Sequence, residues 1–291
     1  MRESILDVLR RGELIISDGA MGTMLQARGL AGGVMPELWN AQRPEVILAV
    51  HQAYLEAGAQ IATANTFGGN RLRLAEAGLA DRSAELVRLG VSLAREAVGD
   101  GAWVAGSVGP TGQILEPYGT LTVSAAEEAY AEQVVALAEA GVDLILLETH
   151  HDSAEAACAI RMVKAHTGLP VFCTFAFDAR GRTMMGLRSA DAATHAEQAG
   201  TDVVGANCGA GPAAVVAALQ GMRDVTRLPL MAQANAGVPR MGESDRTVWD
   251  VTPAQMGEQA QTFVSLGARI IGGCCGTGPE HIAAIAAALR R

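Results

Sequence analysis

The sequence predicts an α/β protein that forms a single (β/α)8 TIM barrel across residues 1–291. Two observations predict this fold. Short apolar runs typical of buried strands alternate about eight times with longer segments of helical periodicity. The length of 291 residues suits one such barrel, and no Pro/Ser-rich linker, charge block or low-complexity tract interrupts the series. A doubly wound open sheet has the same alternation, so the sequence leaves closure of the sheet open.

Eight strands are expected, each an apolar run of five to eight residues. They are 13–17, 61–65, 103–109, 144–149, 170–177, 203–208, 229–235 and 269–275. Helices are expected where apolar residues recur at spacings of three and four. They are 45–58, 84–99, 125–141, 153–168, 191–200, 213–224, 254–267 and 279–290.

Proline and glycine mark the boundaries of these helices. Proline suits the first helical turn, because its missing N–H would have no partner there. The prolines in such positions are Pro44, Pro212, Pro253 and Pro279. Many of the helical segments end in Ala-Gly or Leu-Gly, which fits the left-handed residue that follows a helix end.

The composition excludes several classes of function. A formal net charge of -9 argues against a general nucleic-acid binder and against binding to an anionic membrane surface. No apolar run reaches the roughly 18 residues of a membrane helix, and the first 14 residues carry charges throughout, unlike a secretory signal. We therefore expect a cytoplasmic protein with no nucleic-acid or membrane partner. The single lysine, Lys164, falls on an expected surface helix, which disfavours Schiff-base chemistry.

Polar residues collect where the expected strands end. In a TIM barrel the chemistry is located at the carboxyl ends of the strands, so these residues are candidates for function. Some polar residues occur at any junction of strand and loop, and about half of this set would be expected for that reason alone. The set comprises Asp18, Asn65, Ser107, Glu148, Asp178, Asn207 and Asn235, together with Cys208, Cys274 and Cys275.

The cysteines at two of these ends predict a metal site. Cys208 closes the sixth expected strand, and Cys274 and Cys275 close the eighth, so the two ends lie roughly 10 Å apart. Adjacent side chains on a regular strand point to opposite faces, so convergence of Cys274 and Cys275 requires a distorted, glycine-rich strand end. Three thiolates would bind zinc at about 2.3 Å each and leave a fourth position open, as in catalytic zinc sites.

Other roles for these cysteines remain open at this point. Small packing residues in a glycine-rich turn, or a strained redox pair formed by Cys274 and Cys275, would show the same sequence pattern. Cys158 and Cys173 are expected to be buried packing residues in a helix and a strand.

An open position on a three-thiolate zinc favours thiol chemistry. Zinc stabilises the deprotonated form of an exogenous thiol near neutral pH, and the sulfur remains a nucleophile for an electrophilic carbon. Water activation for hydrolysis is the alternative. Three thiolates donate more charge than histidine ligands, which makes the zinc a weaker Lewis acid for that purpose.

Six motifs give the chain its resemblance to a known family. They are DGAMGTML (18–25), ANTFGGNRLRL (64–74), GSVGPTG (106–112), LLET (146–149), GANC (205–208) and GGCCGT (272–277). In this order they resemble the homocysteine S-methyltransferases. That family includes the homocysteine module of cobalamin-dependent methionine synthase, betaine–homocysteine methyltransferases and enzymes that use S-methylmethionine.

The resemblance implies a barrel of eight strand–helix units and specific site residues. Cys208, Cys274 and Cys275 match the zinc ligands of the family, with the sulfur of homocysteine in the fourth position. Asp18 and Glu148 match the acidic residues that hold the amino-acid end of homocysteine, in agreement with two carboxylates at neighbouring strand ends that can bind an ammonium group.

The methyl donor implied by the resemblance is betaine. The segments 36–40, 105–112, 181–186 and 235–239 look most like bacterial proteins labelled as betaine–homocysteine methyltransferases. Animal betaine enzymes, however, have tyrosines at the positions of Gly68 and Thr149, where they surround the quaternary ammonium group. Trp39 is a candidate for one remaining aromatic contact, and packing at a helix edge explains it equally well. The chain also lacks their carboxyl-terminal extension.

The sequence thus predicts a zinc-dependent homocysteine S-methyltransferase that forms methionine when a zinc-bound homocysteine thiolate attacks an activated methyl group. The alternatives are S-methylmethionine as donor, methylcobalamin on a separate corrinoid protein, and a non-catalytic homocysteine-binding subunit of a corrinoid system. The folate and cobalamin modules of full methionine synthase are not in the sequence, so a corrinoid would arrive on a partner. The oligomeric state, including a homo-oligomer, and the choice among homocysteine, selenohomocysteine and related thiols stay open. His150 and His151 come shortly after Glu148, and an acid–base role for them stays open, but as loop histidines they are expected to be exposed.

Overall fold

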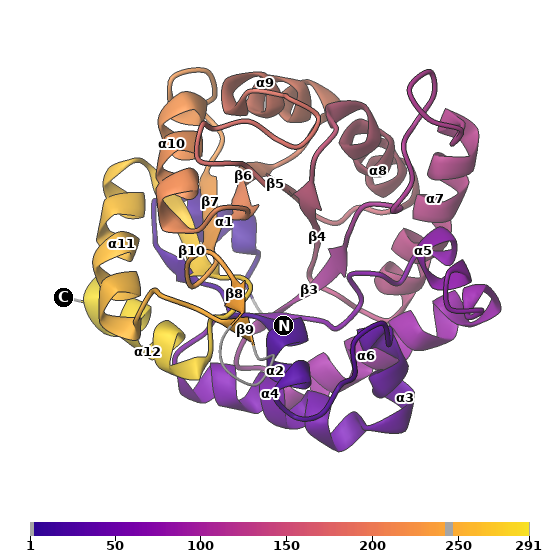
Figure 1. Cartoon of the computed structure of the whole chain (residues 1–291), viewed down its shortest axis with the longest axis horizontal. Coiled ribbons are helices and arrows are strands. Elements are labelled where there is room, and N and C mark those ends of the chain that lie inside the picture. Colours follow the sequence, from indigo (N-terminus) through magenta and orange to yellow (C-terminus); the bar gives the residue numbers. More distant parts are fainter. Residues whose placement is uncertain (1–2, 242–246, 291) are drawn as a thin grey trace.

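The computed structural model describes residues 3–241 and 247–290. Eight parallel strands stand side by side in the order β1-β10-β7-β6-β5-β4-β3-β2. A parallel bridge between Ser17, directly after β1, and Ile61 in β2 joins the two outermost strands of that order. The sheet is therefore closed into a barrel, and the open-sheet alternative is excluded. Figure 1 shows the strands enclosed by a ring of helices.

Each predicted strand overlaps an observed one. The observed strands are β1 (Ile15–Ile16), β2 (Ile61–Thr63), β3 (Trp103–Val108), β4 (Leu144–His150), β5 (Val171–Phe175), β6 (Val203–Cys208), β7 (Leu230–Ala234) and β10 (Ala268–Gly273). All eight predicted helices are confirmed as well. They are α4 (Pro44–Glu56), α6 (Ser83–Val98), α7 (Val123–Glu139), α8 (Ser153–His166), α9 (Ser189–Ala199), α10 (Pro212–Arg223), α11 (Pro253–Ser265) and α12 (Pro279–Leu289).

Several short elements were not predicted, because they are too short to show a period in the sequence. They are α1 (Ile5–Arg10), α2 (Met21–Gln26), η1 (Pro36–Leu38), α3 (Trp39–Gln42), α5 (Arg71–Ala75), η2 (Ala80–Arg82) and a hairpin of β8 (Arg240–Met241) with β9 (Thr247–Val248). Except for α1, these elements lie in connections that follow a strand of the barrel and precede the next outer helix. The carboxyl-terminal end of the barrel therefore carries most of the irregular structure.

The core has two parts. A large cluster of buried side chains fills the space between the strands and the outer helices. A second cluster joins Ile5, Val8 and Leu9 of α1 to inward-facing strand residues such as Ile15 and Phe172. Helix α1 thus covers the amino-terminal end of the barrel, and Figure 1 shows it inside the ring of outer helices.

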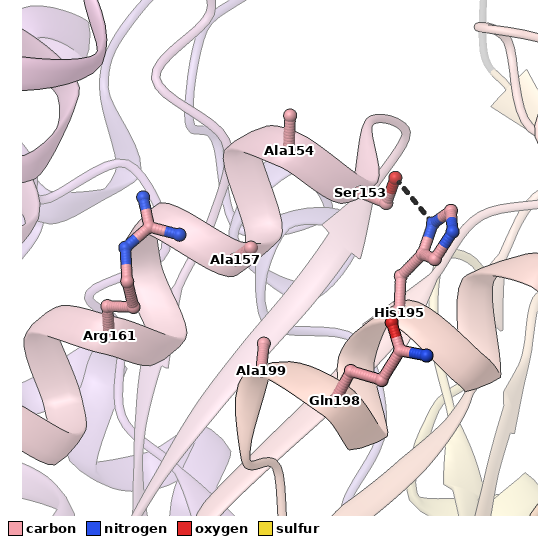
Figure 2. A pocket seen from close by; sticks show the side chains of 7 residues that line it. All are labelled: Ser153, Ala154, Ala157, Arg161, His195, Gln198 and Ala199. Atoms are coloured by element: carbon pink, nitrogen blue, oxygen red, sulfur yellow. Dashed lines mark hydrogen bonds between the residues drawn. The ribbon is translucent and has the colours of Figure 1, made fainter.

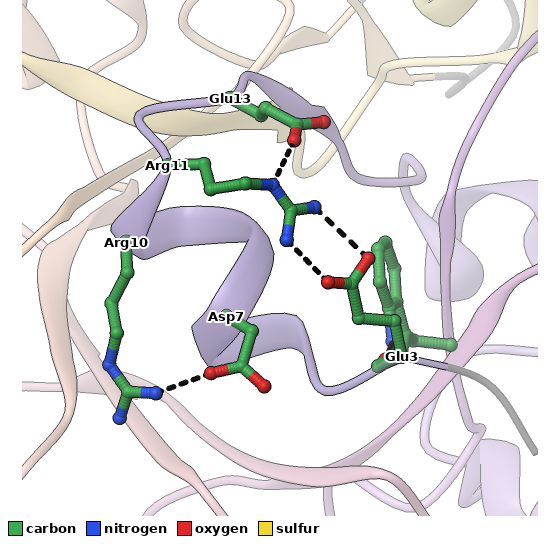
Figure 3. A network of polar contacts seen from close by, with 6 residues as sticks. Glu3, Asp7, Arg10, Arg11 and Glu13 are labelled. Atoms are coloured by element: carbon green, nitrogen blue, oxygen red, sulfur yellow. Dashed lines mark hydrogen bonds and ion pairs between the residues drawn. The ribbon is translucent and has the colours of Figure 1, made fainter.

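Ion pairs join exposed residues in and next to α1. Arg11 donates to the carboxylates of Glu13 and Glu3, and Arg10 donates to Asp7 one turn earlier, as Figure 3 shows. These side chains are largely exposed, so each pair contributes at most about 1 kcal/mol. The apolar face of α1 therefore accounts for most of its attachment to the barrel.

Candidate metal and substrate site

Three cysteine side chains converge at the carboxyl-terminal end of the barrel. Cys208 ends β6, while Cys274 and Cys275 directly follow β10, and β7 lies between these two strands. The three Sγ atoms lie within 4.8 Å of one another, and those of Cys208 and Cys275 are 3.9 Å apart. Two sulfurs bound tetrahedrally to zinc at about 2.3 Å would be about 3.8 Å apart. The cluster therefore fits a zinc ion, and within the described residues it is the one group of three metal-ligating side chains.

The backbone is irregular at both strand ends, which the sequence predicted only for the end that carries Cys274 and Cys275. Cys208 has a φ of 57°, in the left-handed region, which turns its side chain away from the alternation of the strand. Gly276 has a φ of 80°, and a Cβ there would lie only 2.2 Å from the ring of Trp249. A glycine is thus required beside the Cys274–Cys275 pair, both for the turn and for the packing of Trp249.

Hydrogen bonds among the thiols favour one negative charge in the metal-free cluster. The sulfurs of Cys208 and Cys275 lie within hydrogen-bonding distance, and either can be the donor. Hydrogen bonding with Cys274 and Cys275 lowers the pKa of Cys208 to about 3. The same bonds raise the pKa of Cys274, and that of Cys275 to about 12. A metal ion that bound all three sulfurs would displace the two remaining protons.

Asp18 lies in the same end of the barrel, directly after β1. Its side chain is 3% exposed, and it accepts hydrogen bonds from the backbone N–H of Thr63 at 2.6 Å and from the Thr63 hydroxyl at 2.7 Å. Burial raises the pKa of Asp18 to about 6, although these bonds oppose the shift. Thr63, in the last position of β2, was not among the predicted site residues, because its spacing in the strand does not distinguish it from a packing residue.

Glu148 lies on β4, and its carboxylate contacts side chains from β3 and β6. The expectation that Asp18 and Glu148 lie at neighbouring strand ends was wrong, because β2 and β3 lie between β1 and β4 in the barrel. The Ser107 hydroxyl donates to its Oε1, and the side-chain amide of Asn207 lies 3.4 Å from its Oε2. Burial raises the pKa of Glu148 to about 7, and the negative charges of Asp18 and Cys208 add to the shift. Among the described residues, none of the groups that shift the pKa values of Asp18 and Glu148 is cationic. Asp18 is buried and Glu148 is partly buried, and two such carboxylates without a cationic partner in the described part of the chain are suited to bind an ammonium group.

Other predicted strand-end residues divide into two groups. Asn207 and Asn235 lie beside the cysteines, and the Asn235 amide donates to the carbonyl of Gly209 at 2.9 Å. Asn65 instead donates to Pro36 and Asn40, away from the cluster. Asp178 accepts from the backbone of its own loop at Arg180 and Arg182. Asn65 and Asp178 therefore serve local structure.

The prediction that His150 and His151 are exposed was wrong for His150. Strand β4 continues through His150, whose side chain is fully buried beside the rings of Tyr130 and Phe175. It lies in the layer between strands and helices, and burial lowers the pKa of its ring. His151 is partly buried. The error came from the strand end, which the sequence placed one residue too early.

Trp39 is a packing residue. Its ring is 8% exposed within the large core cluster, and the guanidinium group of Arg43 lies 5.2 Å from the ring centroid. The predicted burial of Cys158 and Cys173 is confirmed.

Exposed apolar side chains lie on loops at the same end of the barrel as the site. On the loops that follow β2, β3, β5 and β7, several large apolar residues face solvent, and Tyr118 is 85% and Met184 80% exposed. Others on these loops include Phe67, Ile114, Met185, Val238, Met241 and Val248. By contrast, a surface groove between α8 and α9, where His195 contacts Ser153 (Figure 2), contains none of the candidate site residues. No helix among the described residues is long and apolar enough to span a membrane.

Comparisons with known proteins identify the family of the chain. A family model described as homocysteine S-methyltransferase matches residues 15–289. Methionine synthase from Mycobacterium tuberculosis (strain ATCC 25618 / H37Rv) is 33% identical over 305 residues, which cover 98% of this chain and 25% of that protein. Methionine synthase from Mycobacterium leprae (strain TN) is 32% identical over 298 residues, covering 96% of this chain and 24% of that protein. The chain thus spans about a quarter of the length of these two relatives.

The chain is also similar to a solved structure, and this match covers nearly the whole of both chains. The homocysteine methyltransferase MmuM from Escherichia coli, in its metallated form, matches with a TM-score of 0.79 at 29% identity. The match covers 97% of this chain and 98% of that chain.

Proposed function

The chain belongs to the homocysteine S-methyltransferase family, and on that premise we propose that it transfers a methyl group to the sulfur of homocysteine and forms methionine. The observation that supports this most directly is the pairing of a three-thiol cluster with two carboxylates, Asp18 and Glu148, that have no cationic partner among the described residues. Asn207 contacts both halves, at 3.4 Å from Glu148 and 3.9 Å from Cys274. An amino acid with a thiol at its other end matches this arrangement.

Cys208, Cys274 and Cys275 would hold zinc, and the sulfur of homocysteine would take the fourth position. Bound zinc would keep that sulfur deprotonated near neutral pH, so the protein needs no general base for it. The spacing of the sulfurs and their soft donor character support this assignment.

The protein's own residues orient the substrate. Asp18 and Glu148 would bind the ammonium group, whose positive charge favours the ionised form of both carboxylates. Thr63 and Ser107 fix these carboxylates through their hydroxyl groups. The reaction rate would then depend on alignment of the sulfur with the methyl group and on exclusion of water around it.

Betaine is the proposed methyl donor, on the resemblance of the sequence to bacterial betaine enzymes. The test is methionine formation by zinc-loaded protein with homocysteine and betaine as the only donor. Product at a useful rate supports betaine, whereas no product from protein with bound zinc excludes it. Failure of the zinc-loaded protein to bind homocysteine in a calorimeter would exclude the proposed function as a whole.

A donor carried on a protein partner is the second candidate, and the exposed apolar side chains on loops at the same end of the barrel favour it. Groups of exposed apolar side chains commonly mark surfaces that bind other proteins, and several of the large exposed apolar residues lie on these loops. The mycobacterial relatives are about four times as long as the matched region. This candidate predicts that the isolated chain binds homocysteine, is inert with betaine and S-methylmethionine, and forms methionine when a methylcorrinoid protein is added. A homocysteine-binding subunit without activity would remain inert in all three assays.

A further inference from the structure

Two residues other than glycine have a left-handed backbone in the described chain, and both lie at the candidate site. Thr149 has a φ of 63° and Cys208 a φ of 57°. For side chains of this kind, such a conformation costs about 1–3 kcal/mol and persists only where surrounding contacts enforce it. Thr149 directly follows Glu148, and Cys208 directly follows Asn207, so each unusual residue adjoins a group that contacts the site.

The side chain of Asn207 joins these two strand ends across β5. Its Oδ1 accepts from the backbone N–H of Thr149 at 2.9 Å and from the hydroxyl of Thr174 at 2.8 Å. Its Nδ2 donates to the hydroxyl of Thr149 at 2.7 Å. Two of these three bonds reach Thr149, so Asn207 holds the unusual turn that sets the direction of Glu148.

The second hydrogen on Nδ2 is directed at the site. An amide nitrogen has two hydrogens, and the Thr149 hydroxyl takes one of them. The remaining neighbours of Nδ2 are Glu148 Oε2 at 3.4 Å and Cys274 Sγ at 3.9 Å. One amide thus contacts both the carboxylate proposed to bind an ammonium group and a sulfur of the thiol cluster. Asn207 is 1% exposed and is held on its other face, so its position is fixed.

We propose that Asn207 is a positioning residue that sets the span between Glu148 and the thiol cluster, and thereby selects the length of the amino-acid thiol. This inference rests on the proposed function. A thiol one methylene shorter than homocysteine, such as cysteine, cannot reach both ends of a fixed span. A difference of one methylene in a rigid site changes selectivity by about 10- to 200-fold. Loss of the fixed span would let the shorter thiol approach the affinity of the longer one.

The variant Asn207→Asp distinguishes the hydrogen bonds that Asn207 accepts from those that it donates. A carboxylate oxygen can still accept from the Thr149 N–H and the Thr174 hydroxyl, but it cannot donate to Glu148 or Cys274. Asn65→Asp is the matched control, because Asn65 is also a buried asparagine near the carboxyl end of a strand. Among the described residues its amide donates to Pro36 and Asn40, not to the site. A general effect of the substitution on the barrel would occur in both variants.

The experiment measures zinc content, the Kd values of homocysteine and cysteine by calorimetry, and the Tm of zinc-loaded protein. For Asn207→Asp we expect one zinc per chain, homocysteine bound at least about tenfold more weakly, and preference for homocysteine over cysteine reduced about tenfold or more. In turnover assays, KM for homocysteine should rise while KM for the donor stays within about twofold. Asn65→Asp should lower the Tm and leave both Kd values unchanged.

Thr149→Gly provides a second measurement that does not depend on the folding of Asn207→Asp. Glycine adopts the left-handed conformation without strain, so this variant should fold while losing the hydroxyl bond to Asn207. We expect its preference for homocysteine over cysteine to fall about threefold or more. Unchanged selectivity in both Asn207→Asp and Thr149→Gly, or an equal loss of selectivity in Asn65→Asp, would overturn the proposal. Failure of the unmodified protein to bind homocysteine would instead overturn the proposed function, and this inference with it.

Discussion

The two ends of the barrel differ in what their buried residues do. At the amino-terminal end, α1 places Ile5, Val8 and Leu9 against inward-facing apolar strand residues. At the carboxyl-terminal end, buried and partly buried side chains include carboxylates, amides and thiols, and two described residues other than glycine adopt a left-handed backbone. The same strands run through both ends, so a single set of strands contributes stability at one end and a reactive surface at the other.

Burial of side chains therefore has opposite effects on the stability of the two ends. The apolar end gains free energy from each group that it removes from water. The polar end loses free energy for its buried carboxylates, as the raised pKa values of Asp18 and Glu148 indicate. Substitutions at the two ends should therefore separate activity from stability.

The largest expected effect is at the thiol cluster. Cys208→Ala, Cys274→Ala or Cys275→Ala should each lose bound zinc and lower kcat/KM by at least about 10³-fold, which corresponds to about 4 kcal/mol. Metal analysis and methionine assays check this. Cys173→Ala is the control, since it changes a buried cysteine outside the cluster, and this variant should bind as much zinc as the unmodified protein. Full zinc content in any one of the three cluster variants would contradict the three-ligand assignment.

Next in size is a pH effect at the polar end. The pKa of Asp18 is about 6 when folded and near 3.8 when unfolded, so the folded protein holds the extra proton between these values. The free energy of unfolding should therefore fall as pH rises from about 4 to about 6, by about 3 kcal/mol from this group. Urea unfolding of metal-free protein at several pH values measures it. Asp18→Asn should remove this contribution, and an unchanged slope in that variant would refute the assignment.

A comparable loss of stability, without loss of activity, is expected at the apolar end. Leu9→Ala removes a buried side chain from the contact between α1 and the strands and should cost about 2–3 kcal/mol of unfolding free energy. The kcat and zinc content of the folded protein should stay unchanged, because α1 lies at the opposite end from the site. A fall in kcat at temperatures where the variant is fully folded would show that the two ends are coupled.

The smallest expected effect is on the exposed loops at the same end of the barrel as the site. Met184→Ser and Tyr118→Ser remove highly exposed apolar side chains and should change the free energy of unfolding by no more than about 0.5 kcal/mol. With a free small donor, the kinetics of both variants should match those of the unmodified protein. If a protein partner carries the methyl group, KM for that partner should rise instead. If both variants showed the same kinetics as the unmodified protein with a methylcorrinoid protein as donor, these two side chains would have no role in docking.

Sequence patterns alone determined the strand–helix series and the identity of the thiol cluster. Strand runs and helical periods depend on local spacing, so each of the eight units was predicted within a few residues. Cys208, Cys274 and Cys275 could be grouped because strand ends of one barrel lie on the same side, and their convergence is confirmed by the distances between the sulfurs.

Only the tertiary structure decided barrel closure, the burial of His150 and the contacts of Asn207. Closure depends on the bridge between Ser17 and Ile61, which pairs residues far apart in the chain and leaves no local pattern. The left-handed turn at Thr149 also leaves no signal in the local sequence, because a β-branched residue disfavours it. It is enforced by hydrogen bonds between Thr149 and Asn207 on β6. Local spacing can be read directly from the sequence, whereas contacts between distant strand ends form only when the sheet has closed.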